Sequence, residues 1–471
     1  METRAIETPS VEPVSESSRK TLMQRCVYTC VYLFERIMPD PFVIVILLTA
    51  VTALCAFFLA PHGTPSVILT GWYKGIVGIF TFAFQMVLIL VTGYALANAN
   101  VVQTGLRRVA LLASGPGSAV AIVFAVGAGA TFLNWGFGLV VGAMMAKEVA
   151  KRVRVDFAWL VAASYTSWVL WAFTGMSSSI ALSIASPGSP LNLIEKQIHS
   201  VVPLSQTVFA SWILLPGLLA TVLLPALFML IRPAPGDVIA ADPQALAEQD
   251  AHSDCGVKRK SIAGRLEGSR ICAMVFVVAG VAYLTQEWSQ HGVSLDINTV
   301  IFIFLLTGLA LHGSARAYVD AISKAARVTG PMLLQYPFYG GIMGIMSATG
   351  LAQVASSAFI HFASGHTLPF WSYIGSLFIT LLIPSGGGHW AVQGPFTIPA
   401  AVQLGASLPG TAMGIATGEL AASLLQPFWA IPVVAIAGVG VQRVIGFTFV
   451  SFLACGSFFG LVYLVLVPLL H

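Results

Sequence analysis

The chain has 471 residues, of which 57% are hydrophobic and only 9% are charged. A soluble domain carries about 25% charged residues, so this composition excludes an ordinary soluble enzyme or binding module and indicates a polytopic membrane protein. The formal net charge is only +4, and the basic residues form no patch of the kind that binds nucleic acid. The lipid bilayer is therefore an expected partner of the chain, and nucleic acid is not.

Residues 1–41 are polar and contain five basic side chains, Arg4, Arg19, Lys20, Arg25 and Arg36. No apolar run in this segment is followed by a small-residue cleavage site, so it is predicted to be a cytoplasmic tail rather than a signal peptide. The six cysteines lack the spacing of a metal site. No metal or cofactor is expected.

Apolar segments then recur along the chain, and nine of them are predicted to cross the membrane. Their approximate bounds are 42–60, 76–97, 157–184, 207–231, 271–288, 297–312, 328–350, 409–440 and 447–470. Two further apolar stretches, about 109–147 and 370–404, are interrupted by polar residues. A polar linker over 232–270, rich in Lys and Arg, is predicted to join a first transmembrane half (42–231) to a second (271–471) on the cytoplasmic side.

Basic residues stand at both ends of the first interrupted stretch, with Arg107 and Arg108 before it and Lys147 and Lys151 after it. Because cytoplasmic loops carry an excess of Lys and Arg, both ends are expected on the cytoplasmic face. The stretch must then enter and leave the membrane on one side, as a re-entrant hairpin. Its tip is predicted at Asn134-Trp135-Gly136, and these three residues are candidates for substrate binding.

The span over 157–184 is predicted to be a broken helix, interrupted at Phe173-Thr174-Gly175-Met176-Ser177-Ser178-Ser179. Unwound backbone within a membrane offers carbonyl groups to a cation and N–H groups to an anion. The hydroxyl groups of Thr174, Ser177 and Ser178 are therefore candidates for ion coupling. Ordinary helix packing by Ser and Thr is the alternative.

The second interrupted stretch contains a glycine-rich break from Pro384 to Pro395. The preceding loop, 351–369, has no Lys or Arg, so this hairpin is expected to enter from the outer face. Unpaired backbone groups in lipid cost on the order of several kcal/mol each, so such a break persists only around a cavity. The candidate substrate-binding residues here are Ser385, Gly386, Gly387, Gly388, His389, Trp390 and Gln393.

Glu419 is the only acidic residue in the interior of a predicted span. Its helix is expected to begin near Pro409, which places Glu419 about 15 Å deep. A charge at that depth costs at least about 2.5 kcal/mol, so Glu419 is a candidate for ion coupling, and a protonated structural Glu is the alternative. No Lys or Arg lies within a predicted span, so a carboxylate substrate is expected to be held by backbone N–H groups at the hairpin tips.

The two halves match weakly at an offset of about 251 residues, within segments predicted to run in opposite directions. The matched pairs are Gly93 with Gly344, Asn134 with Ser385, Gly136 with Gly387 and Thr166 with Thr417. The predicted fold is an all-α polytopic membrane protein with inverted-topology repeats, two opposed re-entrant hairpins and broken transmembrane helices. Such repeats imply alternating access to a central site, here with a cytoplasmic N-terminus.

Three segments resemble the bacterial short-chain fatty acid transporter family: Gly71-Trp72-Tyr73-Lys74-Gly75, Ala185-Ser186-Pro187-Gly188-Ser189-Pro190-Leu191-Asn192 and Ile383-Pro384-Ser385-Gly386-Gly387-Gly388-His389-Trp390. The resemblance covers nearly the whole chain from about residue 20. It implies a permease of the bacterial inner membrane for acetoacetate or butyrate. That family is similar to the broader ion transporter superfamily, whose members pair a scaffold with a moving transport domain. The Ser-Asn-Thr tips of its dicarboxylate carriers are absent here, so their sodium sites cannot be transferred.

We therefore expect a secondary carrier for small monocarboxylates driven by H⁺ or Na⁺ symport, with no catalytic residues. A cation/proton antiporter on a related scaffold is the alternative, although it would normally have more than one buried acid. A membrane-embedded enzyme or a subunit of a respiratory complex lacks support, because no catalytic His/Glu/Asp cluster is visible. The coupling ion, chain length, direction and oligomeric state stay open, with a homodimer among the options.

Overall fold

The computed structural model describes residues 39–241, 246, 266–327, 329–426, 429–430, 433–434, 437 and 439–470. Residues 1–38 of the predicted tail and most of the predicted linker lie outside this part of the chain. All regular structure within it is helical, as predicted. Among the described residues, six helical stretches are long and apolar enough to cross a membrane, and a bent pair of helices makes a seventh if it is counted as one span.

The described helices fall into two sets separated by the linker. The first set is α2 (Pro41–Leu59), α3 (Pro65–Gly78), α4 (Phe80–Ala97), α5 (Asn100–Ala110), α6 (Pro116–Leu133), α7 (Trp135–Ala150), α8 (Phe157–Ala172), α9 (Ser179–Ala185), α10 (Glu195–Ile198), η2 (Leu204–Gln206) and α11 (Ser211–Leu230). The second set is α14 (Arg270–His291), α15 (Ile297–His312), α16 (Ala315–Ala326), α17 (Gly330–Thr349), α18 (Leu351–Phe362), α19 (Leu368–Leu382), α20 (Gly386–Leu404), α21 (Leu408–Ser423), α23 (Val441–Leu461), η3 (Val462–Leu466) and α24 (Val467–Leu470).

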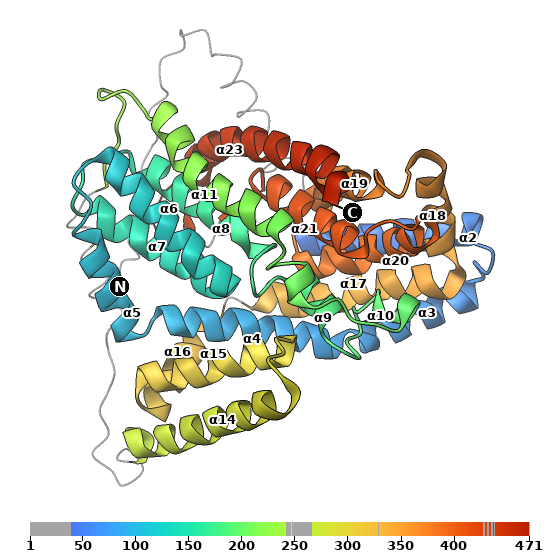
Figure 1. The fold of residues 1–471 in the computed structure, drawn as a ribbon, viewed down its shortest axis with the longest axis horizontal. Helices are drawn as coiled ribbons and strands as arrows, with labels where there is room; N and C mark the ends of the chain where they lie inside the picture. The colour runs from blue at the N-terminus through green and yellow to red at the C-terminus, as the bar shows by residue number, and fades with distance from the viewer. Residues whose placement is uncertain are drawn as a thin grey trace, which may run out of the picture.

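The predicted repeat is visible in the helix boundaries. Helices α8 and α21 both have 16 residues, and α21 begins 251 residues after α8. The same offset separates Trp135, the first residue of α7, from Gly386, the first residue of α20. Figure 1 shows the α6–α7 hairpin on the left of the molecule and the α19–α20 hairpin on the right. Each half thus contributes one helical hairpin.

Helices α3 and α17 cross with no side chain between their backbones. A Cβ atom at Gly75 would lie 2.1 Å from the carbonyl oxygen of Gly340, and one at Gly71 would lie 2.8 Å from that of Gly344. This pairing makes the two helices antiparallel, and each presents two glycines four residues apart. Small residues at this spacing allow the close backbone approach that associates helices in membranes.

The N-terminal half of the second span was predicted wrongly. Helix α3 begins at Pro65, where the hydroxyl of Thr64 accepts from the backbone N–H of Val67, and α3 and α4 together form an apolar stretch of 33 residues, Pro65–Ala97. Lys74 therefore lies inside a candidate span, and the prediction that no Lys or Arg does so is wrong. The mixed composition of Gly71-Trp72-Tyr73-Lys74-Gly75 lowers the local hydropathy, which hid this part of the helix.

The predicted outer loop at 351–369 is mostly helical. Helix α18 occupies Leu351–Phe362 and is bent by 81° from α17. The bend lies at Gly350, whose φ of 82° is in the left-handed region that favours glycine. The chain can therefore turn sharply between two helices without a loop.

The start of the linker is fixed against the first half by Asp156. This buried residue caps α8, with Oδ1 accepting from the backbone N–H of Trp159 at 3.0 Å. Its Oδ2 accepts from the backbone N–H of Ile239 at 3.1 Å and forms an ion pair with Arg443 of α23. One carboxylate thus joins α8, the linker and the last long helix.

The glycine crossing makes a testable prediction. Gly75→Ala should lower the thermal unfolding midpoint in detergent, because a methyl group there overlaps the α17 backbone and such overpacking costs about 1–3 kcal/mol. Gly78→Ala is the matched control on the same helix, because nothing lies within 4 Å of a Cβ at Gly78. Its midpoint should stay the same or rise, since Ala favours a helix over Gly by about 0.5–1 kcal/mol. Equal midpoints for the two variants would contradict the glycine contact.

Candidate functional site

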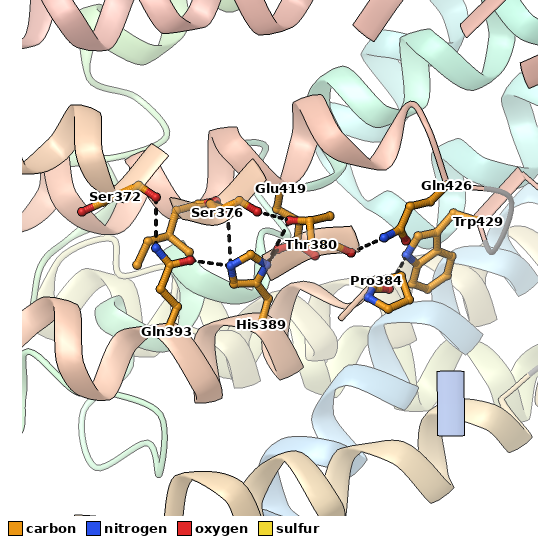
Figure 2. Close-up of polar contacts among 10 residues, drawn as sticks. Ser372, Ser376, Thr380, Pro384, His389, Gln393, Glu419, Gln426 and Trp429 are labelled. Atoms are coloured by element: carbon orange, nitrogen blue, oxygen red, sulfur yellow. Dashed lines mark hydrogen bonds and ion pairs between the residues drawn. The ribbon is translucent and has the colours of Figure 1, made fainter. Parts of the chain in front are cut away.

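The two hairpin tips meet in the interior of the protein at Trp429. Its indole N–H donates to the carbonyl oxygen of Pro384 in the second tip at 2.8 Å (Figure 2). Its ring lies 5.6 Å from the ring of Trp135 in the first tip and 5.5 Å from the ring of Trp168 in α8. The breaks predicted from the sequence are therefore neighbours in space.

The first tip is held by Asn134, which the structure places at the N-cap of α7. Its Oδ1 accepts from the backbone N–H of Phe137 at 2.9 Å, and its Nδ2 donates to the carbonyl of Ile89 in α4 at 3.2 Å. Gly136 packs against the backbone of Leu90, which a Cβ atom would approach to 2.8 Å. The amide of Asn134 is thus used in fixing this tip to α4.

The break between α8 and α9 contacts the same tip. The backbone N–H of Trp135 donates to the hydroxyl of Ser177 at 2.8 Å, and the indole of Trp168 donates to the carbonyl of Trp135 at 2.7 Å. Of the other predicted coupling residues, Thr174 donates to the carbonyl of Leu170 within its own helix turn, and Ser178 caps α9. In this arrangement the three hydroxyl groups support the tip and the helix ends.

The second tip begins at Ser385, whose side chain makes no capping bond to α20. A Cβ atom at Gly386 would lie 2.4 Å from the hydroxyl of Ser179 and 3.6 Å from Oε2 of Glu419. Gly387 and Gly388 instead lie beneath the aromatic rings of α4 and α17: Cβ atoms there would lie 2.5 Å from the ring of Phe82 and 2.3 Å from that of Tyr339. Only the first of the three glycines therefore adjoins the acidic residue.

Three helices bring polar side chains together behind this tip, each at intervals of one helical turn. Helix α19 supplies Ser372, Ser376 and Thr380, α20 supplies His389 and Gln393, and Glu419 and Ser423 of α21 are followed by Gln426. All of these side chains are buried. Figure 2 labels all of them except Ser423, in a row that runs from Ser372 to Gln426, and we call the full set the polar network.

The hydrogen bonds define which nitrogen of His389 carries the proton. The amide nitrogen of Gln393 donates to the carbonyl of Ser372 at 3.0 Å, so its Oε1 faces His389 Nε2 at 2.6 Å. Because that oxygen is an acceptor, Nε2 must be the donor. Nδ1 then faces the hydroxyl of Thr380 at 3.1 Å and Oε2 of Glu419 at 4.0 Å.

Glu419 lies at 0% exposure, and neither carboxyl oxygen has a hydrogen-bond partner within the described part of the chain. The hydroxyl of Ser423 and Oε1 of Gln426 are unpartnered in the same way, although Gln426 Nε2 donates to the carbonyl of Thr380. Buried polar groups are nearly always paired, and exceptions often mark functional sites. Glu419 is thus the member of the network whose two carboxyl oxygens both lack a hydrogen-bond partner, which makes it the first candidate for a functional role.

A cavity of about 20 Å³ separates the two tips. Its lining is mainly apolar and aromatic, and it consists of Met86, Trp135, Trp168, Ala172, Phe173, Ser179, Met332, Tyr336, Gly386 and Trp429. We call it the central cavity. Of the predicted substrate-binding residues, Trp135 and Gly386 line it. Trp390 does not, because its buried indole donates to the carbonyl of Leu191 at 2.8 Å.

The sequence analysis missed the contribution of α19. Ser372, Ser376 and Thr380 contact His389 or Gln393, and their four-residue spacing in an otherwise apolar helix was the available signal. It also missed Ser179, which faces Gly386. No group of His, Cys, Asp and Glu that could hold a metal ion occurs among the residues that the structure covers.

The apolar helices and the buried polar interior define a multi-pass membrane protein. The family model for short chain fatty acid transporters matches residues 22–467. The chain therefore belongs to the short-chain fatty acid transporter family, and it is not an enzyme.

Two bacterial relatives carry a provisional name as short-chain fatty acid transporters. The protein from Escherichia coli is 40% identical over 426 residues, which cover 90% of this chain and 96% of the relative. The protein from Haemophilus influenzae is 39% identical over 417 residues, which cover 88% and 93%.

Two solved structures have a similar fold. The YdaH transporter of Alcanivorax borkumensis, described as having an unusual topology, aligns with a TM-score of 0.58 at 17% identity and covers 92% of this chain and 98% of its own. MtrF of Neisseria gonorrhoeae, described within a class of antimetabolite efflux pumps, aligns with a TM-score of 0.52 at 16% identity, with coverages of 94% and 97%. At these identities the likeness shows a shared fold and nothing more.

The different capping of the two tips predicts different stability effects. Asn134→Ala removes an N-cap and a bond to α4, so it should lower stability by about 1–2 kcal/mol and reduce the thermal unfolding midpoint in detergent. Ser385→Ala, at the equivalent position of the repeat, removes no capping bond and should have a clearly smaller effect. Equal losses for the two variants would show that the tips are held alike.

Proposed function

We propose that this protein is a secondary carrier that moves short monocarboxylates, such as acetoacetate and butyrate, together with a proton. The observation that carries the proposal is the buried, unpartnered carboxyl group of Glu419 beside Gly386 at the second tip. A buried carboxylate without a partner is costly, whereas the protonated acid is neutral and can donate a hydrogen bond. Glu419 is therefore suited to carry a proton across the membrane.

The substrate carboxylate binds at the N-terminal end of α20 in this proposal. The first N–H groups of a helix have no partner inside the helix and attract an anion. Gly386 leaves room for close approach, and protonated Glu419 stands beside it to donate to the same carboxylate. The short apolar tail then lies in the central cavity between Trp135 and Trp168.

Pairing the proton with the carboxylate makes the cargo electrically neutral. A net charge in a low-dielectric interior is strongly disfavoured, so joint movement of anion and proton removes the main barrier. His389 faces Glu419 with the nitrogen that carries no proton, at 4.0 Å. Gln393 fixes the orientation of the ring, so this nitrogen stays turned toward Glu419 while the proton leaves with the substrate.

The central cavity implies that the protein must change shape to bind substrate. A volume of about 20 Å³ accommodates one water molecule rather than a fatty acid. The tips must therefore separate, and alternating access by their movement is part of the proposal. The expected location is the bacterial inner membrane with the N-terminus inside, because Arg107, Lys147 and Lys324 gather around one cavity.

Transport and coupling can be tested together by measuring the accumulation of labelled butyrate in proteoliposomes under an imposed ion gradient. The wild type should accumulate butyrate when a pH gradient is imposed, and an imposed sodium gradient alone should not drive accumulation. Glu419→Gln should abolish the pH-driven accumulation while keeping exchange between equal butyrate pools, because the amide preserves shape but cannot release a proton.

The matched control is Glu287→Gln, which removes an acid from the exposed face of α14 and should leave accumulation unchanged. Wild-type accumulation by Glu419→Gln would remove Glu419 from the coupling mechanism. Accumulation of butyrate by the wild type under a sodium gradient alone would show that sodium, and not the proton, is the coupling ion.

The lining of the central cavity predicts chain-length selectivity. Met332→Ala should enlarge the cavity and improve the kcat/KM of hexanoate relative to acetate by about fourfold per accommodated methylene, because each buried CH₂ contributes about 0.8 kcal/mol. Met346→Ala is the matched control: both methionines lie in α17 at 6% exposure, but Met346 does not line the cavity. Identical selectivity of the two variants would place the tail elsewhere.

A further inference from the structure

Two larger cavities lie beside the two hairpins, at positions related by the internal repeat. The first has a volume of about 400 Å³ and is lined by Met144 and Glu148 of α7. The second has a volume of about 530 Å³ and is lined by Pro395 and Pro399 of α20, which follow those residues by 251 positions. We call them the α7 cavity and the α20 cavity. Each is the approach to one hairpin.

The two cavities differ in charge. Arg107, Lys147 and Lys324 line the α7 cavity, but Glu148 and Asp320 stand among them and nearly balance their charge. The charged residues that line the α20 cavity are Lys74 and Lys196, with no acidic residue in its lining. The α20 cavity is therefore the more electropositive of the two.

The neighbourhood of Lys196 does not neutralise this charge by a direct ion pair. The ammonium group of Lys196 donates to the carbonyl of Pro190 at 2.5 Å. The carboxylate of the adjacent Glu195 accepts from the backbone N–H of Gly188 at 2.8 Å, which directs it toward that loop. Both lysines can thus attract an anion in the cavity.

Lys74 is an exposed cation in a long apolar helical stretch. It lies on α3 within the apolar stretch Pro65–Ala97, where a cation is disfavoured unless it reaches water or a partner. The glycine crossing of α3 and α17 keeps bulky side chains away, and Gly71, Gly75 and Gly344 form part of the same cavity wall. An open cavity with a cation is thus built into the scaffold.

We infer that the α20 cavity is a docking site for the substrate carboxylate, where Lys74 and Lys196 hold it before it reaches the second tip. This inference rests on the proposed function and adds the route by which the anion arrives. Gly394 of α20 lines the cavity, and Gly386 lies eight residues away on the same helix, or about 12 Å. A concave site lined by positive charge concentrates anions and raises their association rate.

The inference makes the two faces of the carrier unequal. The face served by Lys74 and Lys196 captures carboxylates, and the face with nearly balanced charges releases them. The KM for butyrate should therefore be lower from the Lys74 face than from the opposite face.

The test compares butyrate uptake into right-side-out and inverted membrane vesicles at low ionic strength. Lys74→Gln should raise the KM by about three- to tenfold in the vesicle orientation that exposes the α20 cavity to the medium, and by less in the other orientation. Lys74→Arg, which keeps the charge, should retain most of the wild-type KM. The difference between Lys74→Gln and wild type should shrink in about 1 M salt, where the Debye length is about 3 Å.

Arg107→Gln provides the control in the α7 cavity, and it should not raise the KM from the face that Lys74 serves. An unchanged KM for Lys74→Gln in both orientations would overturn the docking site while leaving the proposed function intact. A fall in kcat without a change in KM would also overturn it, because that result indicates a structural role. Failure of the wild type to transport butyrate would instead overturn the proposed function, and this inference with it.

Discussion

Irregular backbone in the interior of a membrane protein must find partners within the protein, and here buried indole groups provide them. The N–H groups of Trp168 and Trp429 donate to carbonyls in the first and second hairpin tips. Trp390 and Trp159 donate in the same way to Leu191 and to Phe228. An indole combines a large apolar surface with a single donor, so it can satisfy a free carbonyl without admitting water. The breaks at the centre of this molecule depend on these bonds.

The two halves share a fold but not a chemistry. Each member of the polar network on α19, α20 and α21 has a repeat counterpart 251 residues earlier, and the counterparts of Ser372, Ser376, Thr380, His389, Gln393 and Glu419 are Ala121, Ala125, Gly129, Gly138, Gly142 and Trp168. The first half thus replaces every polar side chain of this set with a small residue or an indole. His389 and Glu419 thus have no titratable counterpart in the first half, whose hairpin tip is anchored by Asn134.

The two helical hairpins could be predicted from the sequence because the signals that mark them lie within short segments of the chain. The Lys and Arg pattern and the glycine-rich break located both hairpins, and the tips lie at Asn134 and Ser385 as expected. Glu419 stood out because an acid in an apolar helix is rare. The partners of His389 could not be found in this way, because they come from another helix and short Ser and Thr side chains are common in membrane helices.

Packing decided the remaining differences between expectation and structure. Trp390 was expected near the substrate because it adjoins the glycine break. It lies in the first turns of α20 on the face that packs against Leu191, and its indole donates to the carbonyl of that residue. Lys74 was placed before the span because its surroundings are only moderately apolar, although the helix continues through it. Which face of a helix is covered depends on its neighbours, and sequence periodicity alone does not identify them.

The crowded glycines affect how mutational data on this family should be read. Gly387 and Gly388 support the rings of Phe82 and Tyr339, and Gly71 and Gly75 support another helix. Any side chain at these positions displaces a neighbour, so inactivity of such a variant reports on assembly rather than on recognition of the cargo. Gly78, Gly105 and Gly129, where an added Cβ meets nothing within 4 Å, are among the positions at which a glycine scan is free of that ambiguity.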